Sequence, residues 1–214
     1  MIKVLIADDH PVVREGLKQI ISKASDMVVG GEALNGQEVL DKIDAEKWDV
    51  IVLDLNMPGK DGFEVLREIR KDYPKLPVLI LSIYPEEQIG VRVLKAGASG
   101  FLSKESAPKE LLNAIRKIHT GSKYVSPTLA ERLAVAVEVD MGEEPHKRLS
   151  NREYQVLCLI ASGKSINEIA DQLSLSDKTI RTYRDRLMEK MNLKNDVELT
   201  HYAIKHKLIE PLKD

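Results

Sequence analysis

Cysteine, long apolar runs and net charge are all scarce in this sequence. Cys158 is the only cysteine among 214 residues, which excludes a disulfide framework and a thiolate-based metal site and favours a reducing compartment. Its apolar neighbours predict a buried small side chain, not a reactive thiol. No apolar run approaches the roughly 18 residues of a membrane span, and the first ten residues lack a signal-peptide pattern. The sequence therefore predicts a soluble, cytoplasmic protein without a membrane partner.

The formal net charge is only -2, but the charge is unevenly distributed. Residues 146–214 hold 13 basic and 10 acidic side chains, whereas the preceding residues hold 19 basic and 24 acidic ones. The length allows two modest domains. A mildly basic second part is a weak indication of a nucleic-acid partner for that part alone.

The first part alternates between short apolar runs and amphipathic segments. Strands are predicted at residues 2–7, 27–32, 49–53, 78–82 and 100–103. Helices are predicted at 11–22, after the turn at 35–36, and at 62–71, 86–96 and 108–118. The run at 49–53 has no polar interruption, as in a strand buried on both faces. The pattern predicts an α/β fold, a doubly wound five-stranded parallel sheet.

Polar side chains stand where four of these strands end. Asp8 and Asp9 follow the first strand, Asp54 the third, Ser82 the fourth and Lys104 the fifth. A strand order of 2-1-3-4-5 places strands one and three side by side at the topological switch point, where such sheets bind ligands. We therefore expect these side chains to meet in one crevice.

Three carboxylates in one crevice raise each other's pKa unless a cation lies among them. Oxygen ligands with open positions suit Mg²⁺. With the Ser82 hydroxyl and the Lys104 ammonium, the set predicts a site for a phosphoryl group on Asp54. Each member also has an ordinary interpretation: a helix cap for the acid pair, a core-edge hydroxyl, a solvated lysine. The four strand ends together favour the site.

Residues 1 to about 120 resemble the receiver domain of bacterial two-component response regulators, through DDHPVVREGL, VLDLNMPGKDG and GFLSK. The resemblance implies the flavodoxin-like order 2-1-3-4-5, and it makes Asp54 the phosphoacceptor of a sensor histidine kinase or a small phosphodonor. It also implies that Asp9, Asp54 and the backbone carbonyl of Asn56 bind Mg²⁺, with Asp8 acting mostly through water.

The same resemblance assigns Ser82 and Lys104 to the phosphoryl group and makes Phe101 the aromatic switch residue. From the residues alone, Phe101 is an ordinary core side chain. Many receivers have a proline in a cis bond after the lysine, whereas Glu105 follows Lys104 here. A non-proline cis bond costs roughly 3–4 kcal/mol, so that geometry is not expected.

The chain is predicted to divide into a receiver at 1–121, a linker at 122–146 and a second domain at 147–214. A helix at 126–139 lies in the linker, packed on a domain or on a second protomer. Residues 139–146 combine Gly, Pro and acids without periodicity, which predicts a flexible joint.

The second domain is predicted to be a small all-α unit of four helices. Ser150 with Glu153 and Ser165 with Glu168 form capping boxes, and Ser176 begins a third helix. Two short helices joined by a tight turn are typical of a helix-turn-helix. Outward polar residues near the start of the third helix could enter a major groove, although a solvated helix face would look similar.

Residues 147–210 resemble the LuxR-type helix-turn-helix of NarL/FixJ-type regulators, from LSNREYQVL to RDRLMEKMNL. The resemblance directs three side chains to base edges: Arg181, Thr182 and Asp185. It directs four others toward phosphates: Lys178, Thr179, Tyr183 and Arg186. Many relatives have a basic residue in place of Asp185, and an acid there accepts from cytosine but repels phosphate.

A fourth helix at 197–207, capped by Asp196, carries an apolar stripe. In the family this helix supports a two-fold dimer, which predicts dimer contacts at Leu199, Tyr202 and Ala203. A helix that only packs in its own domain would have the same stripe.

These patterns predict a two-component response regulator, in which phosphorylated Asp54 controls dimerisation and sequence-specific DNA binding to regulate transcription. The expected partners are a sensor histidine kinase, double-stranded DNA with inverted-repeat half-sites, and a second copy of the chain, with RNA polymerase as a further candidate. The protein is not expected to be an enzyme, beyond assisting its own phosphorylation and dephosphorylation with Mg²⁺. One alternative is a Mg²⁺-dependent phosphohydrolase, although Asn56 stands where a second acid would be needed. Another is a switch whose second domain binds only protein.

Overall fold

The computed structural model describes residues 1–138 and 144–209 of the chain. The chain forms two compact units, Met1–Leu133 and Ala134–Asp214. Each unit has buried apolar side chains of its own. No helix in the described ranges is both long enough and apolar enough to cross a bilayer.

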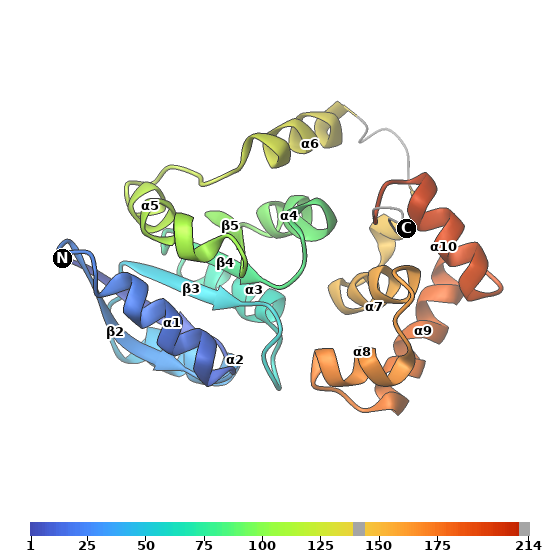
Figure 1. Cartoon of the computed structure of the whole chain (residues 1–214), viewed down its shortest axis with the longest axis horizontal. Helices are drawn as coiled ribbons and strands as arrows, with labels where there is room; N and C mark the ends of the chain where they lie inside the picture. Colours follow the sequence, from blue (N-terminus) through green and yellow to red (C-terminus); the bar gives the residue numbers. More distant parts are fainter. Residues whose placement is uncertain (139–143, 210–214) are drawn as a thin grey trace. The chain divides into compact units, whose positions relative to one another are not determined.

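The first unit is built on a parallel sheet of five strands in the order β2-β1-β3-β4-β5 (Figure 1). The strands are β1 (Ile2–Ala7), β2 (Met27–Ala33), β3 (Val50–Asp54), β4 (Val78–Ser82) and β5 (Gly100–Ser103). Every residue of β3 and β4 is buried, as expected for central strands covered on both faces. The predicted fold class and strand order are confirmed.

Helices connect the strands and cover both faces of the sheet. They are α1 (Pro11–Ile21), α2 (Gly36–Ala45), α3 (Gly62–Asp72), α4 (Glu86–Lys95) and α5 (Ala107–His119). On one face, α1 and α5 pack together over side chains such as Val4, Val52 and Leu81. Because the connections are parallel crossovers, all five strands end at the same edge of the sheet.

Helix α6 (Pro127–Glu138) follows the five-stranded sheet and its helices in the sequence. Its first turn contacts α4: Ser126 Oγ bonds the Glu86 carboxylate, and the fully buried Leu129 lies against Gly90. A Cβ atom built on Gly90 would be 2.8 Å from Leu129 Cδ1, so the missing side chain makes room for the leucine. Of the predicted joint at 139–146, residues 139–143 lie outside the described residues.

In residues 144–209, the described part of the second unit that follows α6, the chain forms a short 3-10 turn, η1 (Pro145–Arg148), and four α-helices. The helices are α7 (Asn151–Ala161), α8 (Ile166–Leu173), α9 (Asp177–Met191) and α10 (Asp196–Lys205). Both predicted capping boxes are present, at Ser150 and Ser165, and Cys158 is buried. The turn η1 was not predicted, because its four residues carry no periodic signal.

The start of α10 differs by one residue from its prediction. Asn195, not Asp196, is the cap: its side chain accepts a hydrogen bond from the Glu198 N–H at 2.9 Å, and Asp196 is the first helical residue. The Glu198 carboxylate in turn accepts from the Lys194 N–H at 2.9 Å. Glu198 is the third helical residue, and its carboxylate reaches back to the residue before the cap and not to the backbone N–H of the cap itself, so the pair is not a full capping box.

Candidate functional site

The carboxyl ends of β1, β3, β4 and β5 bring the predicted side chains to one edge of the sheet. Asp8, Asp54 and Ser82 are fully buried. The Lys104 N–H donates to the Ser82 carbonyl at 2.7 Å, which holds the ends of β4 and β5 together. Because β3 lies between β1 and β4, Asp54 is central in this row.

Lys104 bridges the two buried carboxylates. Its Nζ lies 2.8 Å from Asp8 Oδ2 and 2.8 Å from Asp54 Oδ2. Burial raises the pKa of Asp54, and the nearby Asp8 raises it further, while Lys104 opposes both. For Lys104 itself, burial would lower the pKa, but its contacts with Asp54 and Asp8 outweigh burial and raise it. Lys104 is therefore the cation that keeps two buried acids compatible.

Asp9 and His10 extend the acidic cluster toward the surface. His10 Nδ1 lies 2.7 Å from Asp9 Oδ1, and its backbone N–H donates to Asp8 Oδ1 at 2.8 Å. Asp8, Asp9, His10 and Asp54 each offer one ligand atom, all within 4.8 Å of one another. His10 was not predicted as part of the site, although its place directly after the acid pair is a signal that could have found it.

The donor set fits Mg²⁺. Asp8 Oδ2 and Asp9 Oδ1 are buried oxygens whose close contacts are the ion pairs with Lys104 and His10, and they accept no further hydrogen bond from the described residues. A carboxylate oxygen has two lone pairs, and carboxylate oxygens are the ligands that this ion prefers. A hard cation would therefore find unused acceptor capacity at both atoms.

The loop after β3 turns sharply around Asp54. The Asn56 N–H donates to Asp54 Oδ1 at 3.2 Å, and the Gly62 N–H donates to the Leu55 carbonyl at 3.1 Å. A Cβ atom on Gly62 would be 2.4 Å from the Asp54 carbonyl oxygen, so only glycine allows this close approach. The role of the Asn56 carbonyl as a metal ligand stays a prediction.

Ser82 and Phe101, the predicted switch residues, lie on the neighbouring strands β4 and β5. Ser82 Oγ accepts a hydrogen bond from the Tyr84 N–H at 3.1 Å. Phe101 is buried, with 2% of its surface exposed, beside Ile80 in the sheet. Within the described residues there is no cis peptide bond, so the bond from Lys104 to Glu105 is trans. The switching role of Phe101 stays a prediction.

A second candidate site lies on α9, the second helix of the helix-turn-helix. Ser174, in the left-handed conformation, ends α8, and Ser176 caps α9. Ile180, Leu187 and Met191 are buried on the inner side of α9. The predicted DNA contacts lie on its accessible sides: Lys178, Arg181, Thr182, Asp185 and Arg186 are exposed, and Thr179 and Tyr183 are half-buried. Their contacts with DNA stay predictions.

The predicted dimer residues on α10 are buried or half-buried, unlike the exposed residues on α9. Leu199 and Ala203 have no exposed surface in the single chain, because they face the core that α10 forms with α7. Neither can offer surface to a second copy in this conformation, so the predicted contacts at these two positions need revision. Tyr202 is half-buried, and its hydroxyl lies 2.9 Å from His146 Nδ1. The exposed apolar side chains of α10 are Val197 and Ile204.

Two family profiles match the chain, one in each unit. The profile of the response regulator receiver domain matches residues 4–116. The profile of the bacterial regulatory proteins of the luxR family matches residues 147–203. The first covers the sheet and its helices, and the second covers α7, α8, α9 and most of α10.

Relatives match over nearly the full length. The response regulator UvrY of Escherichia coli is 39% identical over 97% of this chain and 96% of its own. The response regulator GacA of Pseudomonas syringae is 36% identical over 98% of this chain and 99% of its own. The structure of RcsB from Salmonella enterica serovar Typhimurium, bound to promoter rprA in the presence of a phosphomimetic, has a TM-score of 0.63 and 29% identity, covering 94% of this chain and 97% of that one.

A receiver joined to a DNA-binding domain suggests a regulator rather than an enzyme. The strand-end cluster, the helix-turn-helix and the matches over both units lead to one conclusion. The chain belongs to the response regulators that combine a receiver domain with a LuxR-type DNA-binding domain.

Proposed function

We propose that a sensor histidine kinase phosphorylates Asp54, and that this modification controls dimerisation and sequence-specific DNA binding by the second domain. The observation that carries the proposal is the pairing of a fully buried Asp54 with Lys104 at 2.8 Å, beside Asp8 and Asp9. A nucleophilic carboxylate, a cation and oxygen ligands for a metal are what phosphoryl transfer requires.

In the transfer, a carboxylate oxygen of Asp54 attacks the phosphorus of a phosphohistidine. An O–P bond forms, the P–N bond breaks, and the electron pair leaves with the donor imidazole. Lys104 would stabilise the charge on the phosphoryl oxygens. The Ser82 hydroxyl, which accepts from the Tyr84 N–H, can donate its own proton to one of those oxygens.

Mg²⁺ would be held by Asp8, Asp9, Asp54 and the carbonyl of Asn56. When bound, it supplies positive charge that offsets the charge of the phosphoryl oxygens. In its absence Lys104 already neutralises part of the acid cluster, at 2.8 Å from both Asp8 and Asp54. Lys104 and Ser82, at the ends of β5 and β4, would then be the protein's own groups for positioning the phosphoryl oxygens.

The response of the receiver would pass from Ser82 and Phe101 to α4 and then to α6. Ser82 is the last residue of β4 and α4 begins at Glu86, so a shift of the Ser82 hydroxyl toward the phosphoryl group moves the segment that leads into α4. Helix α6 rests on α4 through Leu129 and Gly90. Phosphorylation can bias this switch only by binding its two states differently.

DNA binding would use α9 in a major groove. Arg181, Thr182 and Asp185 would face base edges, and Lys178, Thr179, Tyr183 and Arg186 would contact phosphates. The accessibility of this row and the promoter-bound structure of the relative RcsB support the assignment. The Asp185 side chain is 77% exposed, which suits a cytosine amino group as its partner.

Dimerisation would use Val197 and Ile204, which lie seven residues apart on one side of α10 and are 66% and 40% exposed. A two-fold dimer would present two α9 helices to an inverted repeat. Such a dimer on DNA would work in the cytoplasm, where RNA polymerase is a further candidate partner.

The test compares wild type, Asp54→Asn and the exposed Asp72→Asn control after treatment with a small phosphodonor and Mg²⁺. Wild type and the control should take up one phosphoryl group and gain DNA affinity in a gel shift, while Asp54→Asn should do neither. Phosphate uptake by Asp54→Asn would refute the acceptor site. A phosphorylated wild type without salt-sensitive DNA affinity would instead indicate a protein-binding output.

A further inference from the structure

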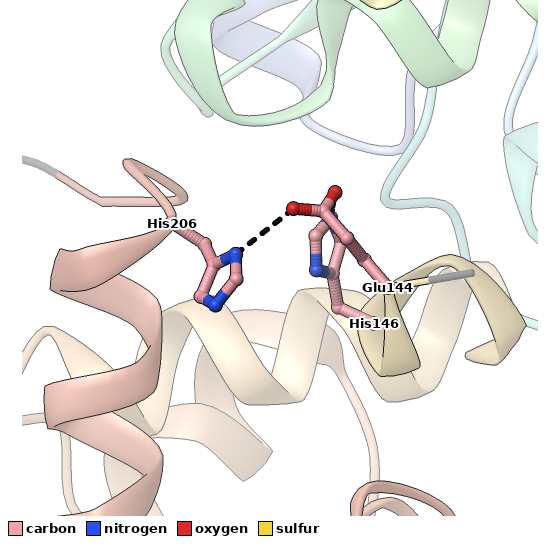
Figure 2. A group of neighbouring side chains, drawn as sticks. All are labelled: Glu144, His146 and His206. Carbon is pink, nitrogen blue, oxygen red and sulfur yellow. Dashed lines mark hydrogen bonds and ion pairs between the residues drawn. The ribbon is translucent and has the colours of Figure 1, made fainter. Parts of the chain in front are cut away.

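Two histidines and a glutamate lie together in the second unit (Figure 2), and none of them is among the residues assigned to DNA. Glu144 precedes the turn η1, His146 lies within it, and His206 follows the last residue of α10. Glu144 and His206 are 62 residues apart. The cluster therefore joins the segment that enters the domain to the end of its last helix.

The donor atoms converge on the Glu144 carboxylate. His206 Nδ1 lies 2.9 Å from Glu144 Oε1, and His146 Nε2 lies 3.6 Å from Glu144 Oε2. One ligand atom from each residue falls within 4.8 Å of the other two. Donors around a tetrahedral Zn²⁺ lie about 3.3–3.6 Å apart, given bonds of about 2.0–2.2 Å. Small side-chain rotations would bring the three atoms to that spacing.

Tyr202 orients both imidazole rings. Its hydroxyl lies 2.9 Å from His146 Nδ1, and its ring stacks on His206 with centroids 4.2 Å apart and planes 22° apart. When His146 Nδ1 donates to Tyr202, its Nε2 carries the lone pair and faces Glu144. Metal-binding histidines commonly have such a partner on the second ring nitrogen, so this is a built arrangement and not a chance surface cluster.

We propose that Glu144, His146 and His206 bind a divalent transition-metal ion of the Zn²⁺ class, with water completing the coordination. Two imidazoles and one carboxylate are ligands that Zn²⁺ favours, whereas Mg²⁺ takes oxygen ligands. The competing cation is Lys147, whose Nζ lies 3.7 Å from Glu144 Oε2. Its side chain is 36% exposed and long enough to turn into solvent when a metal binds.

The bound ion would fix the chain entering the domain against the end of α10. Because metal binds the folded arrangement and links residues far apart in sequence, it would raise the stability of the second unit. The proposed dimer residue Ile204 lies two positions before His206, so the metal would also hold that part of α10.

The test titrates metal-free full-length protein with Zn²⁺ in competition with a chromogenic chelator. Excess Mg²⁺ is present throughout, to occupy the acid cluster of the receiver. Wild type should bind one Zn²⁺ per chain, and His206→Gln and His146→Gln should each lose at least about tenfold in affinity. His201→Gln changes an exposed histidine on α10 and should bind Zn²⁺ as wild type does. Co²⁺ should give the visible absorption of a tetrahedral site in wild type and the control only.

Two further variants test the roles of the surrounding residues. Lys147→Gln removes the competing cation and should tighten Zn²⁺ binding, whereas Tyr202→Phe keeps the ring stack and should weaken binding without changing the stoichiometry. Circular dichroism establishes that each variant is folded. Three results would overturn the proposal and leave an ion-pair cluster. They are equal Zn²⁺ affinity in wild type and both histidine variants, a loss of affinity in His201→Gln equal to that in the histidine variants, and no Zn²⁺ binding by wild type.

Discussion

Asp54 is a charged side chain placed where charge is costly. It has no exposed surface, and a second buried carboxylate, Asp8, shares its only close cation among the described side chains, Lys104. Burial and Asp8 together raise the pKa of Asp54. Nucleophilic sites often carry such a cost, because the groups that make a residue reactive are not those that make a fold stable.

The cost predicts a pH-dependent gain in stability for Asp54→Asn. A carboxyl whose pKa is raised in the folded state stabilises the fold fully only below its unfolded pKa, about 3.9, and that contribution is lost as pH rises through the folded pKa. Removing the charge should therefore raise the unfolding midpoint by a few degrees at pH 7–8, while Lys104 keeps its contact with Asp8.

The measurement is thermal unfolding of wild type, Asp54→Asn and Asp72→Asn between pH 4 and pH 8, without divalent metal. The advantage of Asp54→Asn should shrink as pH falls toward 4, and Asp72→Asn should match wild type throughout. If Asp54→Asn were less stable than wild type at every pH, the ion pair with Lys104 would have to outweigh burial.

For single residues, the sequence predicted correctly which side chains lie together when those side chains directly follow strands. Asp8, Asp54, Ser82 and Lys104 could be placed together because parallel strands end at one edge. His10 and Gly62 could not, since their roles depend on how loops fold back. The burial of Leu199 and Ala203 within their own domain could not be predicted either, because the same apolar stripe is expected for a domain core and for a dimer interface.

Among the elements, capped helices were predicted best, because a cap is a local pattern. The start of α10 shows the limit of that rule. Asn195 and Asp196 are both good caps, and only the position of Glu198 three residues after Asn195 decides between them. The turn η1 has no such pattern, so the cluster of Glu144, His146 and His206 could not be foreseen.

The contact between α7 and α9 yields the next prediction. Glu153 completes the cap of α7 and also accepts from Lys190 Nζ on α9 at 2.7 and 2.8 Å. The Glu153 side chain is 4% exposed, whereas that of Lys190 is 43% exposed. Lys190→Met leaves a buried carboxylate without its cation and should cost about 2–3 kcal/mol, while Glu153→Gln leaves an ammonium that water can solvate and should cost about 1 kcal/mol.

Chemical denaturation of the two variants, with the exposed Lys194→Met as control, measures the asymmetry. The difference in stability between the two variants should also depend on pH. Burial raises the pKa of Glu153, but Lys190 and Ser150 outweigh burial and lower the pKa. The stabilisation is therefore present above the unfolded pKa and is lost as pH falls through the lower pKa of the folded state. Equal losses in the two variants at neutral pH would contradict the prediction.

For the whole molecule, the question is how a change at Asp54 could reach the DNA-binding domain. Leu129 is fully buried and lies against Gly90, at a point where α4 has no side chain of its own. In the sequence, α6 continues from that contact across the boundary between the two units, which falls after Leu133. Together with the bond between Ser126 and Glu86, this contact holds the start of α6 on α4. It involves none of the residues that would bind the phosphoryl group.

Leu129→Ala should therefore separate phosphorylation from its effect. Phosphoryl uptake at Asp54 should proceed as in wild type, but the ratio of DNA affinities with and without phosphorylation should fall toward one, because the linker no longer follows α4. Gly90→Ala should act in the same direction, since its Cβ would displace the leucine. Thr128→Ala, exposed on the same turn, is the matched control. Phosphoprotein gels and gel shifts at one fixed salt concentration supply both readouts, with circular dichroism to check folding. A wild-type affinity ratio in folded Leu129→Ala would show that the signal does not pass through this contact.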